Sequence, residues 1–133
     1  MLRPVVTCEY MLSITKIDNP IRLRERIKPY VLEVMRDAHD NGLTPMRPYF
    51  LEFPDDPRAW EVDTAFLFGR DLLVAPVLEA DARVWDVYLP AGATWTDAWT
   101  GEEFEGGQTV TVDAPLERIP LFLRDGAELP IAG

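Results

Sequence analysis

Hydrophobic positions between residues 20 and 41 recur every three or four residues, with charged residues mostly between them. The apolar positions of this pattern are Leu23, Ile27, Tyr30, Val31, Val34, Met35 and Ala38. The spacing predicts an amphipathic helix over Pro20–Asn41, which Asn19 caps at its start and Gly42 ends. Pro29 lies inside the pattern and should kink or break the helix, because proline has no backbone N–H to donate.

A short apolar run follows the helix. Met46–Leu51 predicts a strand that is covered on both faces, and the helix is expected to pack against it as one helix–loop–strand unit. Asp56 followed by Pro57 predicts a short helix directly afterwards. Thr64–Phe68 predicts a further helical turn, which Gly69 stops.

From Asp71 onward the pattern is that of short strands separated by turns. The expected strands are Leu72–Pro76, Arg83–Leu89, Thr94–Trp99, Gln108–Val112 and Ile119–Leu123. The expected turns are Pro90-Ala91-Gly92, Thr100-Gly101, Gly106-Gly107 and Asp125-Gly126. Turns at intervals of about eight to twelve residues are typical of a small antiparallel sandwich.

The composition indicates one globular domain with a modest core, since 47% of the 133 residues are hydrophobic and 27% are charged. A net charge of −10 opposes binding to nucleic acid or to an anionic membrane. No run of about 18 apolar residues is present to cross a bilayer. Met1–Ile17 lacks the charged start, apolar run and cleavage site of a signal peptide, so we expect a cytoplasmic protein.

Candidate catalytic groups are few. Glycoside hydrolysis needs two carboxylates roughly 5 to 10 Å apart, and Asp55 and Asp56 are the nearest candidates, although adjacent acids before a proline favour a capping role. His39 is expected on the helix surface, where a cation suits the last turn. Cys8 is the only cysteine, so an internal disulfide is excluded. It also lacks neighbouring residues that would stabilise its thiolate. We expect no metal and no cofactor.

Aromatic residues leave two interpretations open. Trp85, Trp95 and Trp99 all fall in the β region, where they could form a platform that stacks against sugars or could fill the core. In a small sandwich the core role is the more common one. The residues by themselves therefore predict a scaffold and no active site.

Several motifs occur in one order along the chain. They are Ile27–Val31, Pro45–Asp56, Phe66–Leu78, Val87–Pro90, Trp95–Asp97, Trp99–Gly101, Ala114–Leu116 and Ile119–Gly126. Together they resemble the C-terminal part of glycoside hydrolase family 31, which contains the α-glucosidases and α-xylosidases. The acidic run that begins at Glu52 leans toward the α-xylosidase branch.

The resemblance implies that Pro20–Asn41 is a late helix, and Met46–Leu51 the eighth strand, of a (β/α)8 barrel. The expected fold class is an α+β fragment, with an N-terminal helix and one strand from a (β/α)8 barrel followed by a small antiparallel β-sandwich. Residues 1–19 are an unassigned N-terminal segment, 20–70 are the remnant of the end of the catalytic barrel, and 71–133 are the C-terminal β-sandwich domain.

The resemblance also implies a function. Members of the family are retaining enzymes with one Asp as nucleophile and a second as acid/base. Both precede the stretch matched here, which starts at Ile21, so no catalytic residue is assigned. The chain is expected to be the C-terminal fragment of a retaining α-glycosidase of carbohydrate metabolism, inactive alone. The alternative is a non-catalytic carbohydrate-binding or interaction β-sandwich that uses Trp95 or Trp99, or that completes a barrel from another chain.

The expected partner of the parent enzyme is an α-linked oligosaccharide. A helix and a strand outside their barrel would expose apolar surface that a barrel normally covers. This surface is expected to comprise one face of the helix together with Met46, Tyr49, Phe50 and Leu51, and to drive self-association.

Overall fold

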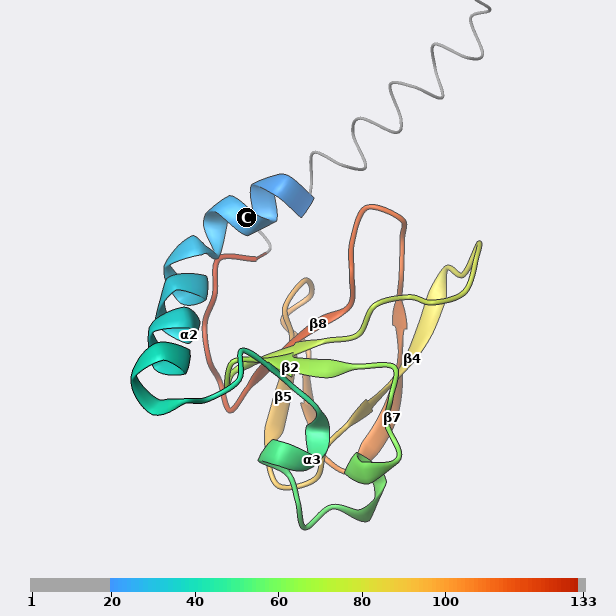
Figure 1. Cartoon of the computed structure of the whole chain (residues 1–133). Helices are drawn as coiled ribbons and strands as arrows, with labels where there is room; N and C mark the ends of the chain where they lie inside the picture. Colours follow the sequence, from blue (N-terminus) through green and yellow to red (C-terminus); the bar gives the residue numbers. More distant parts are fainter. Residues whose placement is uncertain (1–19, 132–133) are drawn as a thin grey trace, which may run out of the picture.

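The structure, a computed structural model, describes residues 20–131. In this part of the chain a helical segment is followed by short strands that form two antiparallel sheets (Figure 1). Cys8 and the rest of the segment 1–19 lie outside the described residues.

The predicted helix is present and is broken near the proline. Residues 20–26 are helical, Ile27 adopts a turn, and α2 (Lys28–Asn41) then begins with Pro29 in its first turn. Gly42 ends α2 in the left-handed conformation, with φ of 68°. Both the break and the glycine stop are therefore confirmed.

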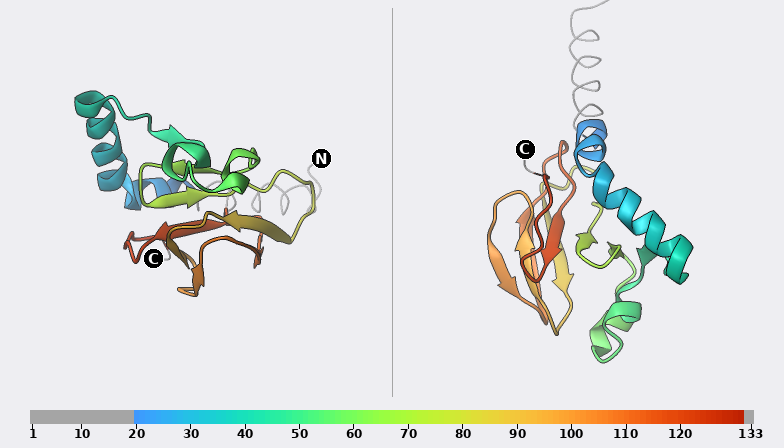
Figure 2. Two further views of the ribbon diagram at one scale, coloured as in Figure 1. Left: turned by 90° about the horizontal axis from the view of Figure 1, so that it is seen from below. Right: turned by 90° about the vertical axis from the view of Figure 1, so that its left-hand side faces the viewer.

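One side of α2 packs onto the sandwich. Figure 2 shows the helix lying beside the sheets. Tyr30 and Val34 are its buried residues. They share an apolar cluster with buried residues of the sheet and of the C-terminal segment: Leu72, Leu121, Leu123 and Ile131. The helix thus covers part of the larger sheet.

The two sheets have simple antiparallel pairings. The strands are β1 (Met46–Arg47), β2 (Phe66–Phe68), β3 (Leu72–Val74), β4 (Val84–Leu89), β5 (Thr94–Asp97), β6 (Glu103–Glu105), β7 (Gln108–Asp113) and β8 (Leu121–Arg124). The larger sheet has the order β1-β2-β3-β8-β5-β6, and β4 pairs with β7 in the smaller one. No helix within residues 20–131 is long and apolar enough to span a membrane.

Side chains of both sheets meet in one core. The larger sheet contributes Leu67, Leu73, Trp95 and Phe122, and the smaller sheet contributes Val87, Leu89 and Val110. Burying each of these side chains stabilises the fold by roughly 1.5 to 3 kcal/mol before the entropy of ordering is subtracted. The described residues form an α+β arrangement with a small antiparallel β-sandwich, as predicted.

The strand predicted over Met46–Leu51 is wrong beyond Arg47. β1 ends there because Pro48 has no N–H to continue the ladder, and α3 (Tyr49–Glu52) follows. The helical turn places Tyr49 and Phe53 on one side, where both are buried, and the Phe53 N–H donates to the Tyr49 carbonyl at 2.9 Å.

The helical turn predicted over Thr64–Phe68 is also wrong. Its last three residues form β2, in which Leu67 pairs with both Leu73 of β3 and Arg47 of β1. Pairing with two distant strands outweighs the local preference of so short a segment. The expected short helix after Asp56 is confirmed as the 3₁₀ helix η1 (Pro57–Trp60).

Other strand boundaries shift by a few residues, and β6 was not predicted. β5 ends at Asp97 because this carboxylate accepts the N–H groups of Trp99 and Thr100 and turns the chain. β6 is an edge strand whose only apolar residue is Phe104, so its pattern is too weak to predict it. The division at residue 70 stays a prediction, although β2 and β3 on its two sides are hydrogen-bonded neighbours.

Candidate functional site

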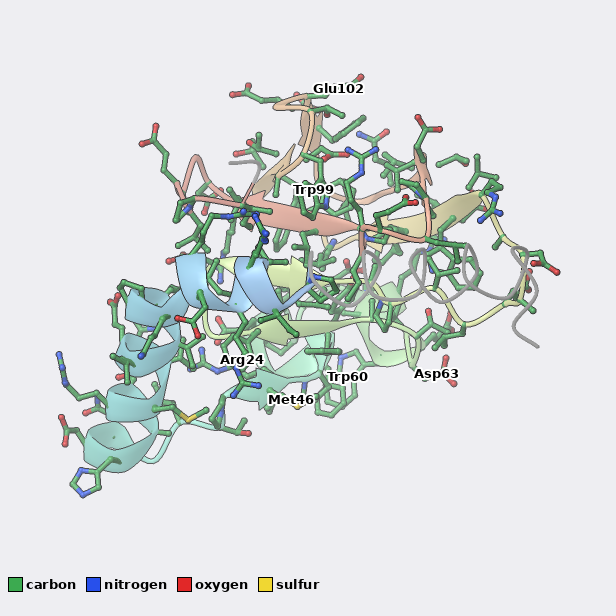
Figure 3. The ribbon with its side chains drawn as sticks, turned by 90° about the horizontal axis from the view of Figure 1, so that it is seen from above. Arg24, Met46, Trp60, Asp63, Trp99 and Glu102 are labelled. Atoms are coloured by element: carbon green, nitrogen blue, oxygen red, sulfur yellow. The ribbon has the colours of Figure 1, made fainter. Side chains whose placement is uncertain are left out.

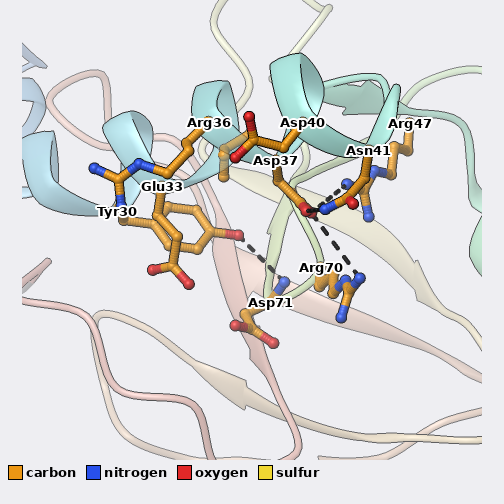
Figure 4. A pocket seen from close by; sticks show the side chains of 11 residues that line it. Tyr30, Glu33, Arg36, Asp37, Asp40, Asn41, Arg47, Arg70 and Asp71 are labelled. Atoms are coloured by element: carbon orange, nitrogen blue, oxygen red, sulfur yellow. Dashed lines mark hydrogen bonds and ion pairs between the residues drawn. The ribbon is translucent and has the colours of Figure 1, made fainter.

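A cavity of about 250 Å³ lies between α2 and the turn that joins β2 to β3 (Figure 4). Charged side chains of both signs line it: Glu33, Arg36, Asp37 and Asp40 from α2, Arg47 from β1, and Arg70 and Asp71 from the turn. The mixture of acids and arginines indicates pairing across the cavity.

Asp37 is the centre of that pairing. Its carboxylate accepts a hydrogen bond from the Asn41 amide at 2.6 Å and lies 3.8 Å from an Arg47 nitrogen and 4.0 Å from an Arg70 nitrogen (Figure 4). Because Asn41, Arg47 and Arg70 approach the Asp37 carboxylate from different sides, this group helps to hold α2 against the sheet.

Tyr30 fastens the same helix at a second point. Its hydroxyl donates to the Phe68 carbonyl at 2.6 Å and accepts the Asp71 N–H at 3.2 Å. Burial raises the pKa of the Tyr30 hydroxyl, so this group stays protonated as a donor. Gly69 lies beside the hydroxyl end of Tyr30, where a Cβ atom would meet the hydroxyl oxygen.

Arg47 belongs to a buried ionic cluster at the carboxyl end of β1. Its side chain is only 4% exposed and donates to a Glu52 oxygen and to the Thr44 carbonyl, each at 2.7 Å. Arg124 of β8 donates to the other Glu52 oxygen at 3.2 Å, and its guanidinium lies 4.7 Å from the centre of the Phe53 ring. Glu52 therefore bridges two arginines on β1 and β8.

The candidate acid Asp56 is a cap. Its carboxylate accepts the Arg58 N–H at 3.0 Å, the Tyr88 hydroxyl at 2.6 Å and the Ala91 N–H at 2.9 Å. Burial alone would raise the pKa of Asp56, but these hydrogen bonds outweigh it and hold the pKa below its usual value. The capping role is confirmed, and Asp55 beside it is exposed.

Alkaline pH should weaken this contact. Burial, and then the hydrogen bond and charge of Asp56, raise the pKa of Tyr88 to about 12. The folded state keeps a proton that the unfolded state loses near pH 10, so the free energy of unfolding should fall by roughly 1 to 3 kcal/mol between pH 10 and pH 12. Urea unfolding across this range measures the change.

The variant Tyr88→Phe isolates the Tyr88 contribution, because Tyr30 and Tyr49 also have raised pKa values and act in the same direction. The variant should start less stable, since Asp56 loses a donor, and should then show a shallower loss above pH 10. Equal slopes for variant and natural chain would contradict the assignment.

The other predicted residues take separate positions. His39 is exposed in the last turn of α2 beside Asp40, with 2.8 Å between its Nδ1 and the carboxylate, so its surface role is confirmed. Trp95 is fully buried and donates to the Pro90 carbonyl at 3.1 Å, which makes it core. Trp85 is half-buried against the same core, and Trp99 borders a surface hollow.

The carboxylates of Asp37, Glu52 and Asp56 each accept hydrogen bonds from donors of this chain. None of the three is therefore free to attack a sugar or to donate a proton to it. Within residues 20–131, no cluster of three His, Cys, Asp or Glu side chains could hold a metal ion. The sites described above therefore bind parts of this chain to one another.

The arginine cluster was missed by reasoning from the sequence, although a signal was available. Arg47 stands in an apolar run, and a charge in a buried run needs a partner, which Glu52 supplies five residues later. Arg124 lies 72 residues from Glu52, and only the folded chain brings them together.

Comparison with known proteins places these features in a family. Residues 42–129 match the family model described as the glycosyl hydrolase family 31 C-terminal domain. An α-xylosidase of Saccharolobus solfataricus is 40% identical over 113 residues, which are 85% of this chain and 16% of that enzyme. A lysosomal α-glucosidase of Bos taurus is 40% identical over 127 residues, covering 84% of this chain and 13% of that enzyme.

Solved structures agree with these matches. The crystal structure of a family 31 α-xylosidase from a soil metagenome, complexed with xylose, superposes with a TM-score of 0.76 at 52% identity, over 80% of this chain and 16% of that one. The chain thus spans 13 to 16% of the length of these relatives. Because the family model matches more than half of the chain and these relatives are at least 40% identical over at least 80% of it, this chain belongs to glycosyl hydrolase family 31.

Proposed function

We propose that this chain is the C-terminal part of a retaining α-glycosidase that hydrolyses O-glycosyl bonds in α-glucosides or α-xylosides, and that it is inactive alone. The observation that carries the proposal is the match of residues 42–129 to the C-terminal domain of the family. The nucleophile and the acid/base Asp that the family uses belong to the preceding part of such enzymes, so this part supplies no catalytic residue.

The contacts within the chain are consistent with a structural role, in which this part of the enzyme stabilises the catalytic barrel. Asp37 and Tyr30 hold α2 on the sheet, and Glu52 ties β1 to β8 through two arginines. These polar contacts fasten helix α2 to the larger sheet, of which β1 is the edge strand. In the parent enzyme this arrangement would hold the last helix of the barrel against the β-sandwich.

An assay with aryl α-xyloside and aryl α-glucoside tests the proposal. The chain alone should give no turnover, and activity should appear when it is mixed with a barrel piece that ends before the position of Ile21. Turnover by the chain alone that is lost on mutating one of its own acids contradicts the proposal. A mixture with a barrel piece that carries a mutated nucleophile is the matched control.

Exposed apolar side chains support the expected contact with a barrel. Met46 of β1, Leu51 of α3 and Trp60 of η1 are each more than half exposed, and α2 adds Leu32. Met46 and Trp60 lie toward the same side of the molecule (Figure 3). Tyr49 does not belong to this surface, because it is fully buried.

We expect these side chains to drive self-association of the chain in isolation. Size-exclusion chromatography with light scattering measures this, and a monomer at high concentration would count against it. Replacing Met46 and Trp60 by serine should shift the distribution toward the monomer. The cytoplasmic location stays a prediction from the sequence.

The relatives named as α-xylosidases make an α-xyloside the first substrate to test in the restored enzyme.

The alternative function is carbohydrate binding or another interaction by the β-sandwich itself. Trp95 is excluded as a platform by its burial, which leaves Trp99 as the residue that this alternative depends on.

A further inference from the structure

The helical segment over residues 20–41 has an apolar stripe on its outer side. Ile21, Leu32 and Met35 form this stripe, and each is about half exposed. Figure 1 shows α2 at one edge of the molecule, and among residues 20–131 no other helix or strand lies outside it. We propose that this face packs against the same face of a second copy of this chain, with the two helices antiparallel.

The segment is continuous enough to present one face. The Ile27 N–H donates to the Leu23 carbonyl and the Val31 N–H donates to the Ile27 carbonyl, each at 3.0 Å, so the helical hydrogen bonds pass across the turn at Ile27. Three helical turns take about 11 residues, which brings positions 21 and 32 to the same side. The stripe therefore runs along most of the segment.

The two halves of the segment have opposite charge, which selects the orientation. Residues 20–28 contain four bases and one acid, and residues 33–41 contain three acids and one base: Arg22, Arg24, Arg26, Lys28 and Glu25, then Glu33, Asp37, Asp40 and Arg36. Parallel packing of two copies would put like charges side by side. Antiparallel packing places the basic half of each copy on the acidic half of the other.

The charges of α2 also run against its own dipole. The helix starts at Lys28 with no acid in its first turn, and Asp40 lies in its last turn beside His39. A helix on its own is stabilised by the reverse order, with acids at the start and bases at the end. In an antiparallel pair, Lys28 lies near the negative dipole end of the second helix. The pattern that is unfavourable in one helix is therefore favourable in the pair.

Single charges match as well. In two copies of residues 20–41 laid antiparallel in full register, Glu25 falls opposite Arg36 and Lys28 falls opposite Glu33, because the members of each pair are equally far from the midpoint. All four side chains are exposed and, in the part of the chain that the structure describes, make no ion pair. They are therefore available to a second copy.

The inference goes beyond the self-association expected from Met46 and Trp60, because it assigns the contact to another element and limits it to two copies. A face that binds itself about a two-fold axis is used up in the dimer and leaves nothing to extend it. One helix from each copy makes a small interface, so we expect a dissociation constant of roughly 10 to 100 µM.

Sedimentation equilibrium of the full chain with Met46→Ser and Trp60→Ser measures this dimer without the other apolar contact. Adding Arg24→Glu and Lys28→Glu makes both halves of the helix acidic and should weaken the dimer by about tenfold or more. A chain that stays monomeric up to millimolar concentration before the charges are changed overturns the inference. So does a dimer that the two charge reversals leave unchanged.

A charge-swapped variant is the matched control. Adding Glu33→Lys and Asp40→Lys to Arg24→Glu and Lys28→Glu gives the two halves opposite charges again and returns the net charge to −10. The dissociation constant should come back to within about threefold of its starting value. Circular dichroism checks that each variant stays helical. A helical swapped variant that does not dimerise overturns the inference.

Cross-linking tests the orientation, in a Cys8→Ser background so that the introduced thiol is the only one. In the antiparallel pair the two copies of position 32 lie within about 5 Å of each other along the helix axis, and those of position 21 about 28 Å apart. A short bismaleimide should therefore link Leu32→Cys chains and leave Ile21→Cys chains unlinked. Equal linking of both variants overturns the antiparallel arrangement.

The outcome is independent of the enzymatic proposal. A chain that pairs through α2 but restores no activity with a barrel piece contradicts only the enzymatic proposal. A chain that restores activity but never pairs by itself contradicts only the paired helices, and it assigns the outer stripe to the barrel.

Discussion

Replacing Glu52 by alanine should lower the free energy of unfolding by about 2 to 4 kcal/mol, slightly less than the roughly 3 to 5 kcal/mol for a fully buried ion pair, because the Glu52 side chain is 22% exposed. Arg47 is 4% exposed and would keep its charge without its closest carboxylate, which lies 2.7 Å away in the natural chain. Arg124 would lose the same partner. Urea unfolding followed by tryptophan fluorescence measures the loss.

Asp125→Asn is the matched control for this prediction. Asp125 also contacts Arg124, at 3.7 Å, but its side chain is 59% exposed. Exposed ion pairs contribute little, so this variant should change stability by less than about 1 kcal/mol. A similar loss in both variants would show that burial of the Glu52 cluster has no special effect.

Loss of the Glu52 cluster should also loosen the carboxyl end of β1. Glu52 is the residue through which β1 and β8 are connected by side chains, in addition to their positions in one sheet. Hydrogen exchange should therefore accelerate in β1 and α3 before it does in β4 and β7. Uniform acceleration across both sheets would contradict a local role for the cluster.

Gly69→Ala should destabilise the chain by about 2 to 4 kcal/mol for two reasons that add. Gly69 has φ of 71°, and a left-handed conformation costs a residue with a side chain roughly 1 kcal/mol. A Cβ atom would in addition meet the Tyr30 hydroxyl and lie 2.7 Å from a Val34 methyl group, and overpacking of this kind costs about 1 to 3 kcal/mol. The helix α2 must move to make room.

Gly42→Ala separates the two causes. Gly42 has nearly the same φ, 68°, but a Cβ atom there meets nothing within 4 Å. This variant should lose only about 1 kcal/mol, from the backbone conformation alone. Urea unfolding compares the variants, and losses of equal size would mean that the close approach of α2 to Gly69 has no energetic effect.

Local sequence was sufficient to predict features that depend on neighbouring residues. The three- and four-residue period of the helix, its break near Pro29 and its stop at Gly42 all follow from backbone rules within one turn. The Asp56 cap is local as well, since it spans two residues. The family also follows from the sequence, because its motifs are short and occur in order.

Tertiary structure alone decided features that depend on distant partners. Residues 66–68 form a strand because β1 and β3 pair with them. Tyr49 begins the short helix α3, which places its side chain in the core. Trp95 and Trp99 look alike in the sequence, yet the first points into the sandwich and the second borders the surface.

The arginine cluster follows the same division. Arg47 and Glu52 are near in the sequence, whereas Arg124 reaches Glu52 only because β8 lies within the same folded sheet as β1. Periodicity and caps are read from adjacent residues, but pairing partners and burial are set by contacts between segments far apart along the chain, whose free energy exceeds the weak local preference of short segments.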